Sequence, residues 1–249
     1  MQMLSDIIEI GDKVEIRILQ EVIRGYEVSE KAHIFKSQLH DIVNEDEIVL
    51  AMPMEAAKVI LLPMDVRYDI TFFTDKGLFN CTGVIKDRYK DGALYEIAMT
   101  LTSQLEKYQR RKFFRLECLV DFSYYILRDP EEINMEDPYA AHEYHLRHFP
   151  EEERKTGVIV DISGGGIRVI TAECIPAETD ILLFFQVLMD DNEYSFSSFG
   201  HVVKSNLAEN SNNRFEGRIE YRKIDKKERE RIVKYVFKEE REKRQNQKK

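Results

Sequence analysis

The chain has 249 residues, of which 43% are apolar and 33% are charged, and its formal net charge is −9. This apolar share excludes wholesale disorder, and the length suits two domains of about 100–150 residues each. An acidic chain is a poor binder of DNA, because non-specific binding depends on neutralising phosphates. No stretch approaches the roughly 18 uncharged apolar residues of a membrane span, and the first residues lack the basic start of a signal peptide. We therefore expect neither DNA as a partner nor an integral membrane segment.

The three cysteines, Cys81, Cys118 and Cys174, lie far apart and form no C-x-x-C pair. Such spacing predicts neither a disulfide framework nor a zinc site, and it favours a reducing compartment such as the cytoplasm. Free cysteines are among the most buried residue types, so we expect three small buried side chains.

The first half of the chain shows the period-two alternation of half-buried strands. In residues 12–19, for example, Val14, Ile16 and Ile18 share one face. The same alternation occurs in residues 33–42, 46–52, 67–75, 78–89 and 93–101. Six short strands joined mostly by short turns predict a small antiparallel barrel. The proline-bracketed residues 53–63 are expected to form a loop or a short helical turn that crosses this barrel.

The second half shows the same period-two alternation and is predicted to end in a helix. Strand-like alternation occurs in residues 116–127, 157–163, 166–173, 180–189, 195–205 and 214–224. Residues 225–244 place their apolar side chains on one helical stripe, and Asp225 is a suitable N-cap. We therefore predict an all-β protein with a C-terminal helix. Its two small antiparallel β-barrel domains are expected in tandem, over residues 1–104 and 105–249.

An acidic block at residues 129–155 interrupts the strand-like alternation of the second half. It holds 9 acidic and 3 basic side chains, a net charge of −6, together with Pro130, Pro138 and Pro150. Long connections of this kind are usually functional or disordered. We expect an insertion between two strands that is partly helical and mostly solvated.

Three histidines in this block, His142, His145 and His148, lie near Glu143. Imidazoles at such spacing are potential metal ligands. Because a helix turns by about 100° per residue, side chains at i, i+3 and i+6 do not converge on one point. We therefore expect a solvated insertion and no metal site.

An arginine-rich segment at residues 109–115 enters the first strand of the second half. Arg111 and Arg115 form an R-x-x-x-R pair, and Arg110 precedes them. The planar guanidinium fork binds phosphate through two parallel hydrogen bonds, and it also reads the edge of a guanine. Phe113 and Phe114 are expected to anchor the segment to the barrel. Taken alone, the pattern also fits a solvated run of charge between two domains.

A second polar group occupies the turn at residues 161–166. Asp161 offers a carboxylate that can accept from guanine N–H groups, and Ser163 offers a short hydroxyl. The glycines at 164–166 are expected to let the backbone approach a ligand closely and to take positive φ. Taken alone, these residues also fit an ordinary hairpin turn.

Together, the R-x-x-x-R pair and the D-x-S-x-x-G turn resemble the PilZ domain. The resemblance covers about residues 105–240, including the amphipathic helix. Upstream, the strands, the segment AMPMEAAKVILLP and the junction LEKYQRRKFFRL resemble the N-terminal partner domain of YcgR-like flagellar brake proteins. Nearly the whole chain is therefore similar to this family, although the acidic insertion lengthens the gap between the two motifs.

The resemblance implies a receptor for cyclic di-GMP with no catalysis and no cofactor. It implies that ligand binding changes the arrangement of the two domains and regulates the flagellar motor through the stator or the rotor switch protein. A cytoplasmic protein associated with the flagellar basal body would suit that role. The implied ligand-binding residues are Arg110, Arg111, Arg115, Asp161, Ser163, Gly165 and Gly166.

One other function stays open at this point. The chain is alternatively a constitutive interaction or adaptor protein whose degenerate pocket binds no nucleotide. A dinucleotide hydrolase would need a metal–carboxylate or nucleophile set, and no such set is recognisable. The basic tail, residues 222–249, also suggests RNA or an anionic membrane, but its apolar stripe better fits a helix docked on a barrel.

Overall fold

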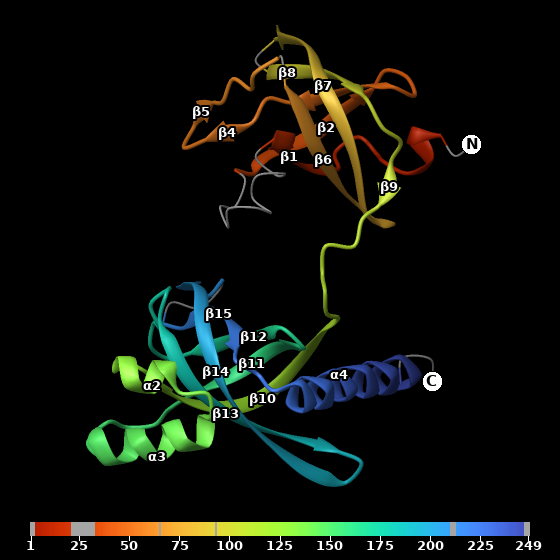
Figure 1. The fold of residues 1–249 in the computed structure, drawn as a ribbon. Coiled ribbons are helices and arrows are strands. Elements are labelled where there is room, and N and C mark those ends of the chain that lie inside the picture. Colours follow the sequence, from red (N-terminus) through yellow and green to blue (C-terminus); the bar gives the residue numbers. More distant parts are fainter. Residues whose placement is uncertain (1–2, 21–32, 65, 93, 210–212, 247–249) are drawn as a thin grey trace. The chain divides into compact units, whose positions relative to one another are not determined.

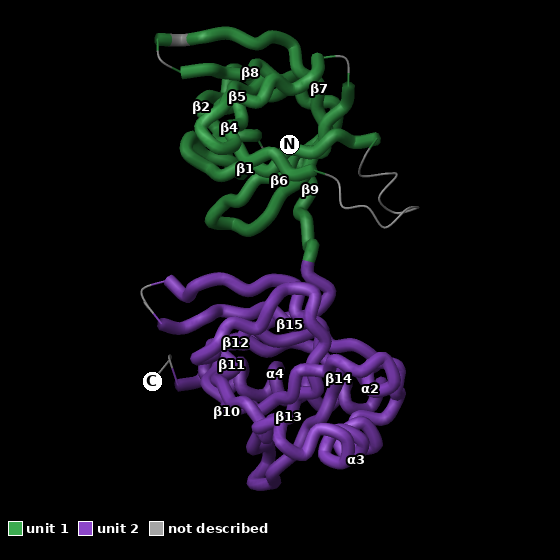
Figure 2. The backbone as a smooth tube through the Cα atoms, turned by 90° about the vertical axis from the view of Figure 1, so that its left-hand side faces the viewer, with its two compact units in different colours: residues 1–110 green, residues 111–249 purple. Residues whose placement is uncertain are grey.

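The fold is given by a computed structural model. It describes residues 3–20, 33–64, 66–92, 94–209 and 213–246. Ala93, where one expected strand begins, and the end of the basic tail at 247–249 lie outside the described residues. The chain separates into two compact units, Met1–Arg110 and Arg111–Lys249 (Figure 2). No helix among the described residues is long and apolar enough to cross a membrane.

Unit 1 is built around one antiparallel sheet that closes on itself (Figure 1). A short 3-10 turn, η1 (Leu4–Asp6), precedes the strands. The strands of the sheet are β1 (Lys13–Ile18), β2 (Phe35–Ile42), β3 (Glu47–Ala51), β6 (Arg67–Thr74), β7 (Gly77–Asp91), β8 (Leu94–Leu101) and β9 (Glu106–Lys107). Their order is β6-β1-β2-β3-β8-β7-β9, and an additional β6–β7 pairing closes the ring. The alternating apolar residues of β1 point inward as predicted, since Val14 and Ile16 are fully buried.

The short β9 strand places the end of unit 1 beyond residue 104. Its two residues pair with Asn80 and Phe79 of β7. The segment around Glu106 and Lys107 therefore belongs to the sheet of unit 1, and the division between the units falls after Arg110.

The proline-bracketed segment forms a small hairpin instead of the expected loop or helical turn. Strand β4 (Met54–Glu55) pairs with β5 (Lys58–Val59), and Ala56 and Ala57 form the turn. Both alanines have positive φ, at 46° and 63°. Positive φ at both central residues is the geometry of a type I′ turn, which Asn-Gly normally signals. Ala-Ala gives no such signal, so the expectation was wrong here.

Unit 2 contains a closed barrel of six antiparallel strands. The strands are β10 (Arg115–Ile126), β11 (Lys155–Ser163), β12 (Gly166–Thr171), β13 (Asp180–Met189), β14 (Asn192–Leu207) and β15 (Phe215–Arg222). They close in the order β10-β11-β12-β15-β14-β13. Helix α4 (Lys226–Asn246) packs its apolar stripe on this barrel, where Ile232 and Val236 are buried in the same core as Ile162. The two barrels and the C-terminal helix confirm the predicted fold class.

The acidic insertion forms two short helices, which confirms the prediction that it is partly helical. They are α2 (Pro130–Asn134) and α3 (Pro138–His148), and each begins with an aspartate cap followed by proline. Most residues of the insertion are exposed, as predicted, but Ala141 of α3 is buried in a separate apolar cluster with Leu127, Leu182 and Phe199. The sequence did not predict this buried face, because the acidic segment has few apolar residues.

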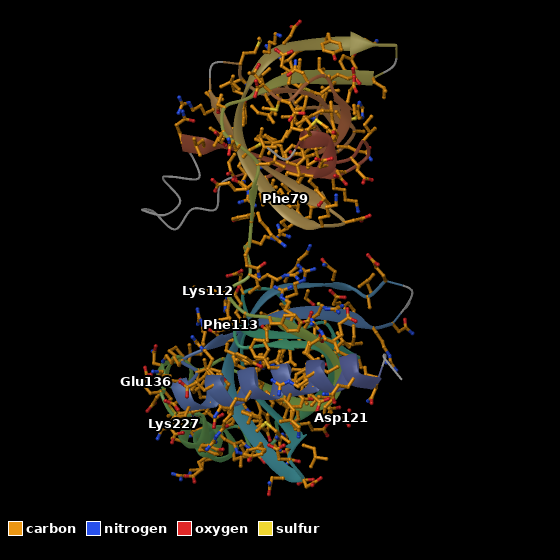
Figure 3. The ribbon with its side chains drawn as sticks, turned by 90° about the vertical axis from the view of Figure 1, so that its right-hand side faces the viewer. Phe79, Lys112, Phe113, Asp121, Glu136 and Lys227 are labelled. Atoms are coloured by element: carbon orange, nitrogen blue, oxygen red, sulfur yellow. The ribbon has the colours of Figure 1, made fainter. Side chains whose placement is uncertain are left out.

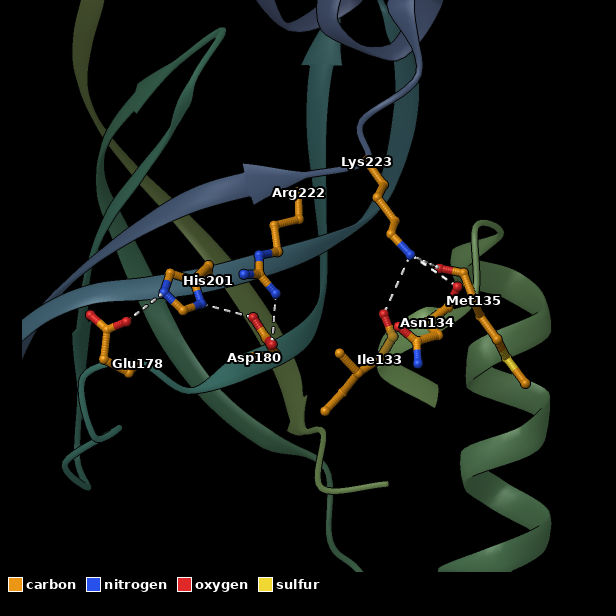
Figure 4. Close-up of polar contacts among 8 residues, drawn as sticks. All are labelled: Ile133, Asn134, Met135, Glu178, Asp180, His201, Arg222 and Lys223. Atoms are coloured by element: carbon orange, nitrogen blue, oxygen red, sulfur yellow. Dashed lines mark hydrogen bonds and ion pairs between the residues drawn. The ribbon is translucent and has the colours of Figure 1, made fainter. Parts of the chain in front are cut away.

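Polar contacts fasten the insertion to the rest of unit 2 (Figure 4). Lys223, which follows β15, donates from Nζ to the carbonyl oxygens of Ile133, Asn134 and Met135 at the end of α2, over 3.4, 3.0 and 3.0 Å. The insertion therefore contacts the connection between β15 and α4 directly. Nearby, Asp180 accepts from His201 and from Arg222, each over 2.8 Å.

The cysteines follow the burial prediction only in part. Cys81 is buried, Cys118 is half-buried and Cys174 is exposed, and all three are free thiols. Burial raises the pKa of the Cys81 thiol to about 12. That thiol is therefore unreactive at neutral pH, because the thiolate is the nucleophilic form.

Candidate ligand-binding site

The strand register brings the two sequence motifs of unit 2 together. Arg115, the first residue of β10, lies opposite Ser163, the last residue of β11. Residues directly opposite each other in an antiparallel pair have Cβ atoms about 4.5–5.5 Å apart. The second arginine of the R-x-x-x-R pair is therefore a direct neighbour of the D-x-S-x-x-G turn. Arg111 is exposed and lies four positions earlier in the same unit.

The turn between β11 and β12 is closed by its own polar groups. The Ser163 hydroxyl donates to the Gly166 carbonyl over 3.1 Å, and it accepts from the Gly165 N–H over 3.3 Å. The Gly165 carbonyl accepts from the Tyr221 N–H over 3.1 Å, which ties the turn to β15. The Ser163 side chain is buried and holds the shape of the turn.

The glycines of this turn are needed for space. Positive φ was expected at 164–166, but the described glycines with positive φ are Gly11, Gly77 and Gly92. A Cβ atom at Gly166 would lie 2.2 Å from the Ile219 carbonyl oxygen, which no side chain tolerates. The close approach at Gly166 is therefore between two strands of the protein itself, and the expected approach to a ligand stays a prediction.

Phe113, which is labelled in Figure 3, packs its ring against the glycine turn and so anchors the arginine segment there. A Cβ atom at Gly164 would lie 2.6 Å from the Phe113 ring and 2.8 Å from Val233 of α4. The guanidinium carbon of Arg229 lies 5.7 Å from the centroid of the same ring. The turn, the arginine segment and α4 therefore meet around one aromatic side chain.

Phe114 anchors the same segment on α4. Its ring stacks on the Phe237 ring with 6.0 Å between centroids. The predicted aromatic anchors are thus present, but α4 contributes as much as the barrel. The helical stripe at residues 225–244 indicated a docked helix, and no signal in it indicated contact with the motif segment.

Asp161 already has a cationic neighbour. Its carboxylate lies 3.9 Å from Arg168 Nε, and Arg168 Nη1 donates to Glu216 over 3.2 Å. Arg168 lies opposite Asp161 in the β11–β12 register. Sequence reasoning missed this arginine, although an i, i+7 pair across a glycine turn is the spacing that makes two residues cross-strand neighbours.

Arg110 is held within unit 1. Its Nη1 atom donates to Glu15 over 3.2 Å, and its guanidinium carbon lies 5.0 Å from the centroid of the Phe73 ring. The same Glu15 oxygen accepts from Arg17 over 3.1 Å. The predicted ligand-binding arginines therefore lie in different units of the chain.

The histidines of the insertion have structural surroundings. His145 is buried and lies 2.6 Å from the buried Glu132 carboxylate. Burial lowers the pKa of His142, with a further lowering by Arg154. Among the described residues, no group of three or more histidine, cysteine or acidic side chains is placed to hold a metal ion.

Two family models match the chain and together span most of it. The model described as "Flagellar protein YcgR" matches residues 9–98, and the model described as "PilZ domain" matches residues 109–238. The second match covers more than half of the chain. The resemblance carried by the two motifs and by the N-terminal segments is confirmed.

Two solved structures that align with the chain are compared with it by their fold. The structure of the Bacillus subtilis inhibitor of motility MotI/DgrA aligns with a TM-score of 0.70 and 19% identity, over 95% of this chain and 100% of that one. The complex of Escherichia coli YcgR with c-di-GMP aligns with a TM-score of 0.46 and 14% identity, over 96% of this chain and 88% of that one. The first of these likenesses shows the fold. No curated protein matches this chain.

Proposed function

Because the chain belongs to the PilZ domain family, we propose that it is a receptor for cyclic di-GMP that acts through protein contacts and not by catalysis. The observation that carries the proposal is the pairing of Arg115 with Ser163, which sets an arginine beside the polar turn. The ligand has two phosphates and two guanines, and these are the groups that arginine forks and carboxylates recognise.

The proposed roles follow the chemistry of each side chain. Arg111 and Arg115 bind phosphate and guanine, and Arg110 adds to them. Asp161 accepts from guanine N–H groups, since an ionised carboxylate is an acceptor only. The turn residues that complete the proposed site are Ser163, Gly165 and Gly166.

The proposed target is the flagellar motor, through its stator or rotor switch protein. Support comes from the match of residues 9–98 to a flagellar protein model and from the fold shared with an inhibitor of motility. A ligand that binds one arrangement of the two units more tightly than others shifts their populations toward that arrangement. This role places the protein in the cytoplasm, at the flagellar basal body, with cyclic di-GMP as a ligand and no cofactor.

Calorimetry of the full chain with cyclic di-GMP tests the proposal. We expect saturable binding that is lost or strongly weakened in Arg111→Ala and Arg115→Ala. Arg147→Ala is the control, because Arg147 is an exposed α3 arginine outside the proposed site. Absence of binding by the unaltered chain would refute the receptor and favour a constitutive adaptor. Equal affinity of all variants would refute the site.

A further inference from the structure

One face of helix α4 lies against the arginine segment and the glycine turn. Arg229, Val233 and Phe237 follow one another at intervals of four residues, so their side chains share one side of the helix. Phe237 stacks on Phe114, and Val233 lies 2.8 Å from the position of a Cβ atom at Gly164. Arg229 is the charged member of this face and the one nearest the start of α4.

The guanidinium of Arg229 lies over the aromatic ring that joins the two motifs. Its central carbon is 5.7 Å from the centroid of the Phe113 ring. Phe113 belongs to the R-x-x-x-R segment, and its ring lies 3.1 Å from the position of a Cβ atom at Gly165 in the turn. A further guanidinium is therefore held beside the D-x-S-x-x-G turn, and it comes from α4 and not from either motif.

This guanidinium has no acidic partner among the described residues. Arg229 forms no ion pair there, and its Nε atom is buried without a hydrogen-bond acceptor. Asp225, one helical turn earlier, accepts instead from the Lys227 N–H over 3.0 Å. Glu228 pairs with Arg231 over 3.5 Å. A buried donor without an acceptor costs free energy, so this position favours a ligand that supplies an anionic oxygen.

We propose that Arg229 is a further ligand-binding residue of the cyclic di-GMP site and that it binds a phosphate of the ligand. This inference rests on the function proposed above. Arg115 reaches the turn from β10, opposite Ser163, whereas Arg229 reaches it from α4. A guanidinium binds two phosphate oxygens through parallel N–H groups, and an aromatic ring beside it helps to hold it in place. Arg229 is half-buried as a residue, so part of its side chain is open to solvent.

The proposal gives α4 a direct role in ligand recognition. A ligand held by the two motifs alone would touch β10 and the turn but not this helix. A phosphate bound by Arg229 also ties the first turns of α4 to the glycine turn. We therefore expect slower hydrogen exchange of the backbone amides around Arg229 when the full chain is saturated with cyclic di-GMP.

Calorimetry of the full chain with cyclic di-GMP compares three variants. Arg229→Gln should lower the affinity by about tenfold or more, because it removes a charge-assisted contact to phosphate. Arg229→Lys should recover only part of that loss, because an ammonium lacks the planar fork. Arg231→Gln is the matched control, since it removes the same charge two residues away, on a different side of α4, where Arg231 is 51% exposed. It should change the affinity by no more than about twofold.

A spectroscopic measurement separates ligand contact from a merely structural role of Arg229. The Nε–H signal of the Arg229 side chain is assigned in NMR spectra by its loss in Arg229→Gln. It should shift when the full chain is saturated with cyclic di-GMP, whereas the Nε–H signal of Arg231 should not. An unmoved Arg229 signal, or equal affinity of Arg229→Gln and the unaltered chain, would overturn this proposal and leave the receptor intact. Absence of binding by the unaltered chain would overturn both.

Discussion

Arg110 donates from Nη1 to Glu15 over 3.2 Å, so one proposed ligand-binding arginine is an ion-pair partner of the N-terminal barrel. The guanidinium also lies against the Phe73 ring. A phosphate that recruits Arg110 must compete with both contacts. From the proposed role of Arg110 we therefore expect the pair to oppose ligand binding and to give the N-terminal barrel an influence on affinity.

Removing the charge of Glu15 should tighten cyclic di-GMP binding. Ion pairs of this partly exposed kind contribute about 0.2–1 kcal/mol, so we expect Glu15→Gln to raise the affinity by up to about fivefold. Glu47→Gln is the matched control, because it removes an ion pair with Lys86 elsewhere in unit 1. Calorimetry measures both variants. Weaker binding by Glu15→Gln would show that Glu15 supports the ligand-binding arrangement.

The affinity for cyclic di-GMP should depend on the planar geometry of the Arg115 guanidinium as well as on its charge. Losing a charge-assisted contact to a buried anion costs about 2–5 kcal/mol, so Arg115→Ala should abolish most binding. Arg115→Lys should recover only part of the loss, because an ammonium cannot reproduce the planar fork. Full recovery by lysine in the same titration would reduce the role of Arg115 to that of a point charge.

Two of the three glycines of the turn, Gly165 and Gly166, should respond differently to replacement by alanine. Gly166→Ala places a Cβ against the Ile219 carbonyl oxygen, and we expect unit 2 to lose about 1–3 kcal/mol of stability or more. Gly165→Ala meets the Phe113 ring at 3.1 Å, which a small ring movement relieves. Thermal unfolding followed by circular dichroism compares them. A larger loss in Gly165→Ala would contradict the packing described for this turn.

The acidic insertion should stabilise unit 2 without contributing to affinity. Replacing residues 131–153 with a glycine–serine linker exposes Leu127, Leu182 and Phe199, and burial is worth about 25 cal/mol per Å² of apolar surface. We expect unfolding several degrees lower and cyclic di-GMP affinity within about tenfold, because loop length itself costs little. An unchanged melting temperature would show that the cluster around Ala141 contributes no stability.

Local patterns predicted the elements of this fold because alternation and helical stripes are short-range properties. The sequence also indicated both motifs, since each occupies only a few consecutive residues. It did not indicate that the Phe113 ring packs on Gly164 or that Val233 of α4 contacts the same glycine. It also did not indicate the ion pair between Glu15 and Arg110. Those contacts join residues tens of positions apart, and no short pattern records them. The buried Ala141 was missed for the same reason.

The central claim is that cyclic di-GMP binding changes the arrangement of the two units, and a distance between them tests it most directly. Spin labels at Lys36 of β2 and Lys204 of β14, both exposed, report that distance by double electron–electron resonance. The exposed Cys174 and the half-buried Cys118 are first replaced by serine, so that labelling is confined to the chosen positions. A ligand-dependent shift of the distance distribution, with unchanged circular dichroism, is the predicted result. Identical distributions in the absence and presence of saturating cyclic di-GMP, under conditions where calorimetry shows binding, would contradict the switch.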